Sequence, residues 1–303
     1  MFHSCISKVW AYVVSQLFNK VFSNLNSLRY TLSEPALLFL ARARYEKGYT
    51  NSHQSPLITV YTPTYNRSSI LMERAFTSVL AQSYKNFEYV IVGDHCNDET
   101  EKLVSEVKDP RIRFYNLPNR GWRYPETAEN HWLAGPVVPA NQALEMATGQ
   151  WIARIDDDDT WTPDHLEVLL KLAQDNNYEF VSGQYETEEN GKKKIHEGVR
   201  ASSYYSYKQK TNNDNGPLIG GTSTWLYRSY LKFMRYNINC WRKSWNRVND
   251  TDFGNRIFKS GVRMGFLPKV LSHVLPRPGE SQVGLKAYLS SANEKEEHYK
   301  FNS

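Results

Sequence analysis

The alternation of two kinds of segment from residue 56 onward most constrains how this chain can fold. Short apolar segments rich in β-forming residues alternate with segments of helical periodicity. This arrangement builds a largely parallel sheet that is covered by helices on both faces. The first predicted strands are Leu57–Tyr61, Phe87–Val92, Ile112–Tyr115, Trp151–Ile155 and Phe180–Tyr185. The sequence therefore predicts an α/β fold.

Helical patterns and turn signals fill the intervals between these strands. Asp98 and Thr162 have the side chains of N-cap residues, and the Asn190-Gly191 pair predicts a hairpin turn. The stretch 119–139 has no clear period and is predicted to be a long loop with a functional or substrate-gripping role. The stretch 200–215 is rich in tyrosine, serine, lysine and asparagine and is predicted to be a mobile surface loop. The predicted helices are Ser69–Gln82, Glu99–Val107, Asn141–Thr148, Pro163–Asp175 and Asp250–Lys259, and two later strands are Gly221–Tyr227 and Arg263–Leu271.

The first 55 residues have a different pattern and are predicted to form a helical extension. Met1–Phe22 is amphipathic, and a second helix is predicted to start at Ser33 and to stop at Gly48. Residues 1–25 fit peripheral contact with a membrane, and they fit equally well a helix packed on its own domain or on a partner. Polar residues interrupt the apolar run and no small-residue cleavage site follows, which disfavours a secretory signal.

Composition excludes several classes of protein. The chain has 303 residues and 40% hydrophobic content, enough for one α/β domain at 56–283 with an extension at 1–55 and a polar tail at 284–303. A mean hydropathy of −0.61 without a long apolar stretch argues against a membrane-spanning helix. The net charge of +5 is scattered along the chain, so no nucleic-acid partner is expected. Three distant cysteines indicate a reducing, cytoplasmic compartment.

Four consecutive aspartates, Asp156 to Asp159, follow the apolar strand Trp151–Ile155 directly. Unpaired carboxylates are costly to bury, so they must face solvent or a cation. The carboxyl ends of strands in an open α/β sheet line the ligand crevice, which favours a cation here. On an extended segment Asp156 and Asp158 would point to one side and Asp157 to the other. Oxygen ligands indicate Mg²⁺ or Mn²⁺, and the alternative is a solvated acidic turn.

Three motifs in the same order resemble glycosyltransferase family 2, the large inverting family with the GT-A fold. The segment I-D-D-D-D-T-W-T-P-D-H-L (155–166) resembles its metal-binding motif. V-Y-T-P-T-Y-N-R (60–67) resembles its first strand and nucleotide loop, and Y-V-I-V-G-D-H-C-N-D-E-T (89–100) its second strand. His95 and Cys96 stand where the family usually has glycine and serine. The resemblance covers residues 57–277 and implies a Rossmann-like, mostly parallel central sheet flanked by helices.

The resemblance implies a nucleoside-diphosphate-sugar donor, with UDP favoured, and Mn²⁺ or Mg²⁺ as cofactor. Asp94 would accept a hydrogen bond from the base. The family usually has an arginine for the phosphates where this chain has Ala140, and Arg120 and Arg123 are the nearest substitutes. The other implied site residues are Thr62, Tyr65 and Arg67 around the nucleotide, Asp158 and Asp156 on the metal, and Asp156 and Asp157 near the ribose.

An inverting transfer needs one general base beside the acceptor hydroxyl. V-N-D-T-D-F-G-N-R-I (248–257) resembles the family's late acidic motif, which implies Asp250 as the base and Asp252 as the second candidate. Both could instead be ordinary acids in the first turn of a helix. His273 is a further candidate near the metal or diphosphate, although a packing role is the simpler account. The candidates for stacking on an acceptor sugar are Trp225, Trp241 and Trp245.

The sequence thus predicts an inverting glycosyltransferase that acts on a hydroxyl of a glycan or lipid-linked acceptor. If residues 1–25 bind lipid, it would work at the inner face of the membrane. A sugar nucleotidyltransferase is one alternative, but it would require a glycine-rich basic phosphate loop, and T-P-T-Y-N-R is not one. A non-catalytic sugar-binding or scaffold protein that retains the fold is the other.

Overall fold

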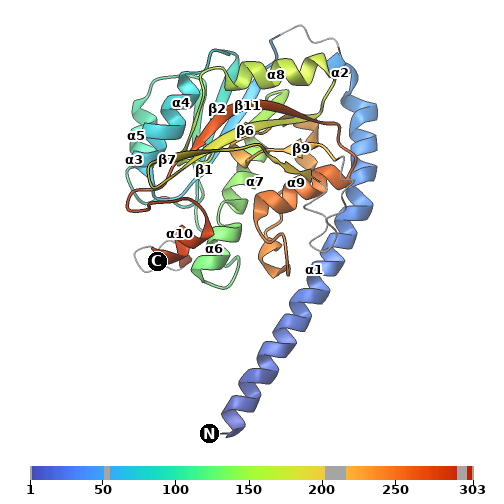
Figure 1. Ribbon diagram of the computed structural model, residues 1–303, viewed down its shortest axis with the longest axis vertical. Helices are drawn as coiled ribbons and strands as arrows, with labels where there is room; N and C mark the ends of the chain where they lie inside the picture. The colour runs from blue at the N-terminus through green and yellow to red at the C-terminus, as the bar shows by residue number, and fades with distance from the viewer. Residues whose placement is uncertain (1, 51–54, 202–215, 292–298, 302–303) are drawn as a thin grey trace.

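A nine-stranded sheet forms the centre of the molecule (Figure 1). The computed structural model describes residues 2–50, 55–201, 216–291 and 299–301, with side chains from residue 13 onward except that of residue 50. The strands lie in the order β3-β2-β1-β4-β10-β6-β11-β5, and β7 pairs with β6. Their bounds are β1 Ile58–Thr64, β2 Phe87–Gly93, β3 Ile112–Asn116, β4 Trp151–Arg154, β5 Asp159–Trp161, β6 Phe180–Glu189, β7 Lys192–His196, β10 Leu226–Arg228 and β11 Met264–Val274.

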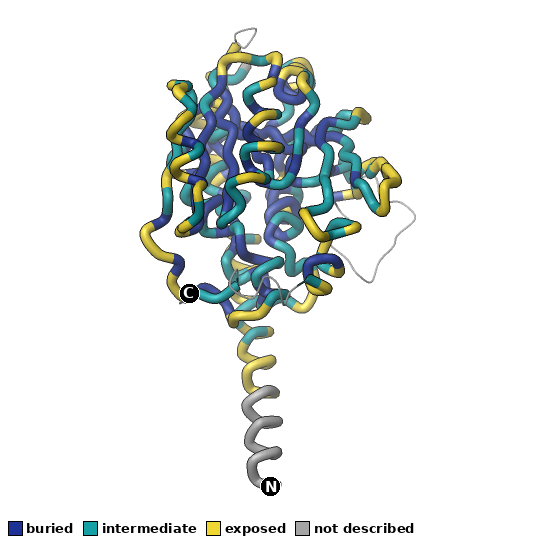
Figure 2. The backbone as a smooth tube through the Cα atoms, turned by 90° about the vertical axis from the view of Figure 1, so that its left-hand side faces the viewer, coloured by how far each residue is buried: buried dark blue, intermediate teal, exposed yellow. Residues whose placement is uncertain are grey.

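Strands β3, β2, β1 and β4 are parallel neighbours. Their apolar residues alternate between two cores: Ile58 and Val60 of β1 belong to one, and Tyr61 belongs to the other. Burial on both faces explains the largely apolar sequence of β1, β2 and β4, whereas β3 lies at the edge and is only partly buried (Figure 2). The predicted α/β class is confirmed, and the carboxyl ends of β1, β2 and β4 lie along one edge.

The other half of the sheet is mixed. β10 is antiparallel to β4 and β6, whereas β11 is parallel to β6 and antiparallel to β5. Asn190 and Gly191, with φ of 50° and 72°, form the predicted hairpin turn between β6 and β7. Two short strands, β8 Val199–Arg200 and β9 Leu218–Ile219, form a separate pair. Apart from Arg200 and Ala201, the predicted loop 200–215 lies outside the described residues.

The predicted strand Gly221–Tyr227 is wrong in its first half. Residues Thr222–Thr224 form a 3-10 turn, and β10 begins only at Leu226. The hydroxyl of Thr224 donates to the carbonyl of Gly221 at 2.7 Å and closes this turn. Gly220 passes so near the Gly183 carbonyl that a Cβ there would lie 1.9 Å from its oxygen. Gly220 and Gly221 therefore allow close packing of the backbone at this bend, which the sequence pattern does not reveal.

Helices cover both faces of the sheet. The predicted helix Ser69–Gln82 is interrupted by a π-helical turn at Met72–Phe76. The predicted loop 119–139 is wrong, since it contains α6 and the start of α7; the Thr127 hydroxyl caps α6 by accepting from the Asn130 N–H. The bounds are α3 Ser68–Leu71, α4 Thr77–Leu80, α5 Thr100–Glu106, α6 Ala128–Ala134, α7 Val137–Met146, α8 His165–Asp175, α9 Asn249–Lys259 and α10 Leu285–Ser290.

One long helix, α1 (Phe2–Tyr45), replaces the two helices predicted for the extension, and a single turn, α2 (Lys47–Thr50), follows it. Ser33 is not a cap, and Pro35 lies inside the helix. A proline interrupts a helix less when tertiary contacts hold both sides of it. Here Asn26 bonds to Asn237 at 3.2 Å and Arg42 to Glu179 at 2.7 Å. None of the described helices is apolar over enough of its length to cross a bilayer.

Candidate active site

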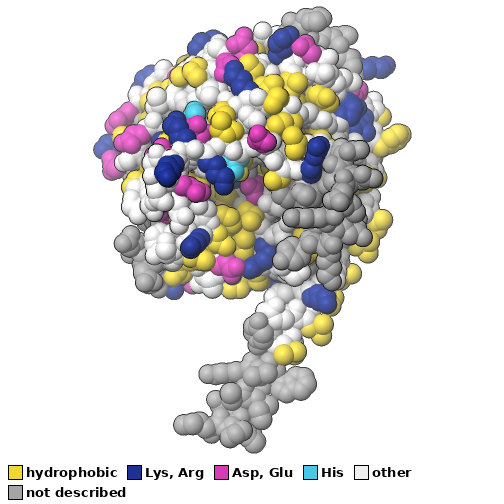
Figure 3. Space-filling model, viewed as in Figure 1, with side chains coloured by type: hydrophobic (Ala, Val, Ile, Leu, Met, Phe, Trp, Pro, Cys, Tyr) yellow, Lys and Arg dark blue, Asp and Glu magenta, His cyan; other side chains and the backbone are white. Residues whose placement is uncertain are grey.

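A cavity of about 530 Å³ opens at the carboxyl ends of β1, β2 and β4. Figure 3 shows a hollow in one face of the molecule, with basic, acidic and histidine side chains around it. The loop after β11 and helix α10 close one side of the cavity, and the start of α9 closes another. Of the predicted site residues, those that line it are Tyr65, Arg67, Asp94, Asp156, Asp157, Asp158 and Asp250.

The four-aspartate run turns instead of extending. The N–H of Asp159 bonds to the carbonyl of Asp156 at 3.2 Å, and Asp159 then starts strand β5, which pairs with β11. The predicted alternation of side chains is therefore wrong, because it requires an extended backbone. Asp157 and Asp158 both contact Arg67, at 2.9 and 3.4 Å. The run thus presents a compact group of carboxylates to the cavity.

Asp158 has two arginine partners. Arg277 Nε donates to its Oδ2 at 2.7 Å, and Arg67 contacts the same oxygen at 3.4 Å. Burial alone would raise the pKa of Asp158, but these two guanidinium groups outweigh burial and lower it to about 2. Asp158 is consequently an ionised carboxylate at neutral pH. The prolines on either side of Arg277 stiffen the segment that brings it here.

The other three aspartates of the run have different partners. Arg154, a buried arginine on β4, contacts Asp156 at 2.8 Å, and the Thr64 hydroxyl donates to Asp157 at 2.8 Å. Burial raises the pKa of both carboxyls despite these partners. Asp159 accepts from the Ser223 hydroxyl, and burial next to the other aspartates raises its pKa strongly. Asp159 is thus a buried side chain that is hydrogen-bonded within the protein.

Asp94 lies at the end of β2 between two buried arginines. Arg123 contacts its carboxylate at 2.6 Å, and Arg120 at 3.2 Å. The Arg120 guanidinium also lies 4.1 Å from the ring centre of Tyr65. Arg120 and Arg123, predicted as phosphate ligands, therefore hold the carboxylate at the predicted base end of the cavity. His95 has a φ of 62°, a conformation that favours the glycine usual in the family at this position.

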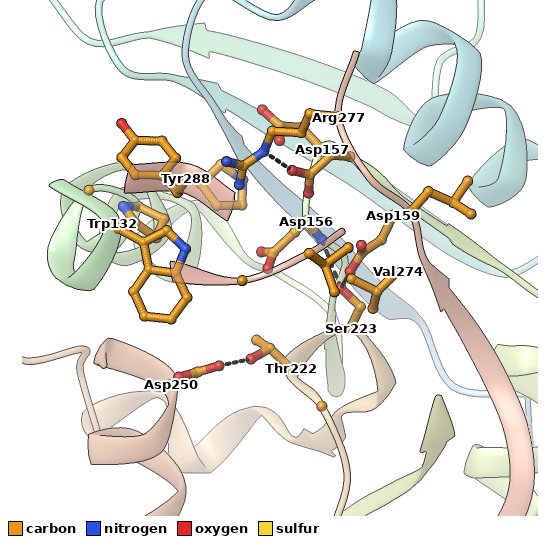
Figure 4. A pocket seen from close by; sticks show the side chains of 18 of the residues that line it. Trp132, Asp156, Asp157, Asp159, Thr222, Ser223, Asp250, Val274, Arg277 and Tyr288 are labelled. Atoms are coloured by element: carbon orange, nitrogen blue, oxygen red, sulfur yellow. Dashed lines mark hydrogen bonds and ion pairs between the residues drawn. The ribbon is translucent and has the colours of Figure 1, made fainter. Parts of the chain in front are cut away.

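Asp250 lies in the first turn of α9, across the cavity from Asp156 (Figure 4). One carboxylate oxygen accepts from the Thr222 hydroxyl at 2.6 Å, and the other from the Thr251 N–H at 2.6 Å. These two donors fix the orientation of the carboxylate. Thr222 is supplied by the 3-10 turn that the sequence analysis mistook for strand.

Several predicted residues lie outside the cavity. Asp252 is buried in a second cavity, where Lys243 and Arg256 contact it at 2.8 and 3.3 Å. His273 lies 3.2 Å from Glu186, while its neighbours on β11 line the main cavity. Thr62 is buried and bonds to the Tyr89 hydroxyl. Of the three candidate tryptophans, Trp225 and Trp241 are buried in the core, and Trp245 lines the second cavity.

The sequence analysis missed many lining residues, and four of them bear on the chemistry of the site. Trp132 and Tyr288 project from α6 and α10 on the same side of the cavity (Figure 4). Trp132 was missed because its helix was taken for a loop. Arg154 had a signal, since it is the one charged residue in an apolar strand. The only sequence signal for Arg277 was its position between two prolines.

The charges of the cavity suit a divalent cation. Among the described residues that line it, six are aspartates, whereas three are arginines, Arg67, Arg154 and Arg277. Within the same part of the chain, no three aspartate, glutamate, histidine or cysteine side chains converge as a complete metal site. A cation held by one or two of these carboxylates would need a ligand's oxygens to complete its shell, as Mg²⁺ at nucleotide sites does.

Curated relatives match the middle of the chain. The chain is 40% identical over 123 residues to the putative colanic acid biosynthesis glycosyl transferase WcaA of Escherichia coli K12, covering 40% of this chain and 39% of that protein. It is 31% identical over 130 residues to E. coli UDP-Glc:alpha-D-GlcNAc-diphosphoundecaprenol beta-1,3-glucosyltransferase WfgD, covering 43% of this chain and 46% of WfgD. The chain spans less than half the length of each of these relatives.

Solved structures share the fold. S. aureus TarS 1-349 in complex with UDP-GlcNAc superposes with a TM-score of 0.55 at 18% identity, covering 74% of this chain and 60% of that one. Mannosyltransferase PcManGT from Pyrobaculum calidifontis, in complex with GDP-Man and Mn²⁺, gives 0.52 at 18% identity, covering 88% and 70%. The family model described as Glycosyl transferase family 2 matches residues 59–124 and 129–234. Because this match includes more than half of the sequence, the chain belongs to glycosyl transferase family 2.

Proposed function

We propose that this protein is an inverting glycosyltransferase. It moves a sugar from a nucleoside-diphosphate sugar, with UDP favoured, to a hydroxyl of a glycan or lipid-linked acceptor. Family membership and the names of the relatives support the reaction class. One observation carries the proposal. Asp250 and the aspartate run line the same cavity and face each other across the space for a sugar.

The donor would lie along the carboxyl ends of β1, β2 and β4. Tyr65 and Asp94 mark the base end, and the aspartate run marks the diphosphate end. TarS was solved with UDP-GlcNAc, which supports a uridine nucleotide by fold likeness. A divalent metal bound at Asp158 and Asp156 would neutralise the charge that develops on the leaving diphosphate.

Arg277 and Arg67 are the proposed diphosphate contacts of the protein, in place of Arg120 and Arg123. Both guanidinium groups line the cavity beside Asp158, whereas Arg120 and Arg123 are held on Asp94. Asp158 would share its charge with a bound metal, and Arg277 and Arg67 would then be able to donate to phosphate oxygens, which suit a planar guanidinium.

Asp250 is the proposed general base. In a single displacement the acceptor oxygen bonds to the anomeric carbon as the bond to the diphosphate breaks, and the hydroxyl proton passes to a carboxylate. Asp250 is held by two donors on the far side of the cavity from the leaving group, as this geometry requires. Trp132, which is only partly buried, provides a ring face on which the acceptor sugar can stack.

The Asp250→Asn variant tests this proposal. Asparagine keeps the size and the bond from Thr222 but is a far weaker proton acceptor, so transfer should fall by about 10²–10⁴-fold. Donor binding should stay within about twofold, because Asp250 does not contact the nucleotide end. The donor is first identified by thermal shift with UDP, GDP and their sugars, with and without Mn²⁺. Transfer of the labelled sugar to membrane lipid is then measured.

The matched control for that experiment is Asp164→Asn, an acid near the same aspartate run that pairs with Lys269 outside the cavity. It should transfer sugar like the wild type. Transfer at wild-type rate by Asp250→Asn would remove Asp250 from the mechanism. If no nucleotide stabilised the protein, a non-catalytic scaffold would be favoured instead.

A further inference from the structure

Helix α1 carries an apolar face that the domain does not cover. Its members lie alternately four and three residues apart along the helix, with Pro35 in the remaining place of the pattern. Their exposed fractions range from 50% for Val21 to 71% for Phe39. We call this row the apolar seam; it consists of Val14, Phe18, Val21, Leu25, Leu28, Leu32 and Phe39.

The seam lies opposite the face by which α1 packs on the domain. Asn26 and Glu34 on that packing face contact Asn237 and Arg256, and Leu38 is buried in the core. On a helix of 3.6 residues per turn, the centre of the seam lies roughly 110–150° around the helix from Asn26, Glu34 and Leu38. Figure 1 shows α1 extending beyond the domain, and Figure 3 shows hydrophobic side chains along it. The domain therefore fixes the rotation of α1 and turns the seam outward.

The exposed charges of α1 indicate what covers the seam. Lys20, Arg29 and Arg44 are exposed on α1. The one acidic residue of the helix, Glu34, is buried on the packing face. Val13, Leu17 and Leu40 are also exposed, at 51%, 61% and 61%, and they widen the apolar face beyond a single row. A wide apolar face on a helix whose exposed charges are all basic is the pattern of a helix lying in the surface of an anionic bilayer.

A second copy of the chain is the main alternative occupant, because a four-three spacing also occurs in coiled coils. Paired helices usually carry opposite charges at the positions beside the seam. Here those positions are Ser15, Phe22, Arg29 and Ala36 on one side and Leu17, Asn24, Thr31 and Leu38 on the other, without an acid. Pro35 would also fall within the contact. Both features disfavour self-pairing.

We infer that α1 binds the surface of an anionic lipid bilayer through the apolar seam, lying along the membrane over about 38 Å from Val14 to Phe39. The contact extends well beyond residues 1–25, the stretch for which the sequence suggested membrane contact. It does not depend on the proposed reaction, and it holds the domain beside the membrane whatever its substrate.

Vesicle flotation of the full-length protein tests this inference. Wild type should float with vesicles of phosphatidylcholine mixed with phosphatidylglycerol, and less with pure phosphatidylcholine or at high salt. The Leu25→Gln/Leu28→Gln/Leu32→Gln variant should lose more than about tenfold in binding. The Lys20→Glu/Arg29→Glu variant should lose binding to the mixed vesicles, and its binding to pure phosphatidylcholine should stay as in the wild type. The control Ile195→Gln/Val199→Gln/Leu289→Gln changes three similarly exposed apolar residues elsewhere and should bind like wild type.

Absence of wild-type binding, or equal binding by the glutamine variant of the seam, would overturn the inference. So would a dimer in sedimentation velocity that the same variant abolishes without any vesicle binding, since this outcome assigns the seam to a second copy. Thermal unfolding checks that each variant folds, and Leu32→Gln alone, at a site 68% exposed, serves if the triple variant does not. Nucleotide-induced thermal shifts should be the same in all folded variants, which separates this test from that of Asp250.

Discussion

At the scale of single residues, the site joins acids at one edge of the sheet with arginines that come from distant parts of the chain. Asp94, the aspartate run and Asp250 follow or precede elements whose ends meet at one edge of a parallel sheet, so chain order alone brings them together. Arg277 reaches Asp158 from 119 residues away along the chain. Such pairing depends on tertiary packing, and neither charge nor spacing in the sequence specifies it.

Asp158 offers the sharpest test of the metal site. Its lowered pKa leaves it ionised, and it is surrounded by cations that a metal would partly replace. Asp158→Ala should weaken Mn²⁺ binding by at least about a hundredfold, because changing a group that only orients a metal ligand already costs about 10–100-fold. Binding of UDP without metal should be kept, since Arg277 and Arg67 are then available to the diphosphate.

For Asp158→Ala, Mn²⁺ is titrated in the presence of UDP, and the thermal shift of the protein is the readout. Asp164→Ala serves as control, because this acid belongs to the same region of the chain but lies outside the cavity. An unchanged Mn²⁺ dependence in Asp158→Ala would move the metal to other residues.

At the scale of elements, regular strands were predicted better than helix limits. Strands β1, β2 and β4 have the apolar residues that burial on both faces requires. Helix α6 was missed although Thr127 was available as its cap, because the stretch 119–139 shows no clear helical period. Helix α1 was divided at Ser33 because local cap signals cannot include the contacts that α9 supplies to Glu34. Tertiary contacts overrode local preference at both places.

The packing of α1 on α9 predicts a pH dependence of stability. Glu34 is 4% exposed, and burial raises its pKa to about 7 even though Arg256 opposes the rise. Asp252 also raises this pKa, and Arg29 lowers it. A carboxyl whose pKa is higher in the folded state destabilises the fold as it ionises. The stability that protonated Glu34 provides is therefore lost as pH rises from about 4.5 to about 7.

Glu34→Gln should remove this dependence while keeping an oxygen for Arg256. Relative to the wild type, the free energy of unfolding of the variant should rise by about 3 kcal/mol between pH 4.5 and pH 8. Urea unfolding of both proteins at the two pH values measures the change. A constant difference between them across this range would show that Glu34 titrates normally in the folded protein.

At the scale of the whole molecule, α1 connects the domain to the proposed membrane surface, and its two halves have unequal structural roles. The second half packs against three parts of the domain: Glu34 meets Arg256, Arg42 meets Glu179, and Leu38 enters the core. In the described part of the first half, contacts with the domain centre on Arg242, which bonds to Asn19 and faces the rings of Phe18 and Phe22. The second half therefore stabilises the fold, and the first half mainly extends the seam.

Two truncations separate these roles. Removing residues 1–24 should change the unfolding temperature by less than about 2 °C and keep nucleotide binding, because few contacts are lost. Removing residues 1–45 takes Leu38 out of the core and leaves Arg256 and Glu179 each without one charged partner; the lost leucine burial alone costs about 1.5–3 kcal/mol. The unfolding temperature should then fall by at least about 5 °C. Calorimetry with and without UDP checks both, and equal unfolding temperatures would contradict a structural role for the second half of α1.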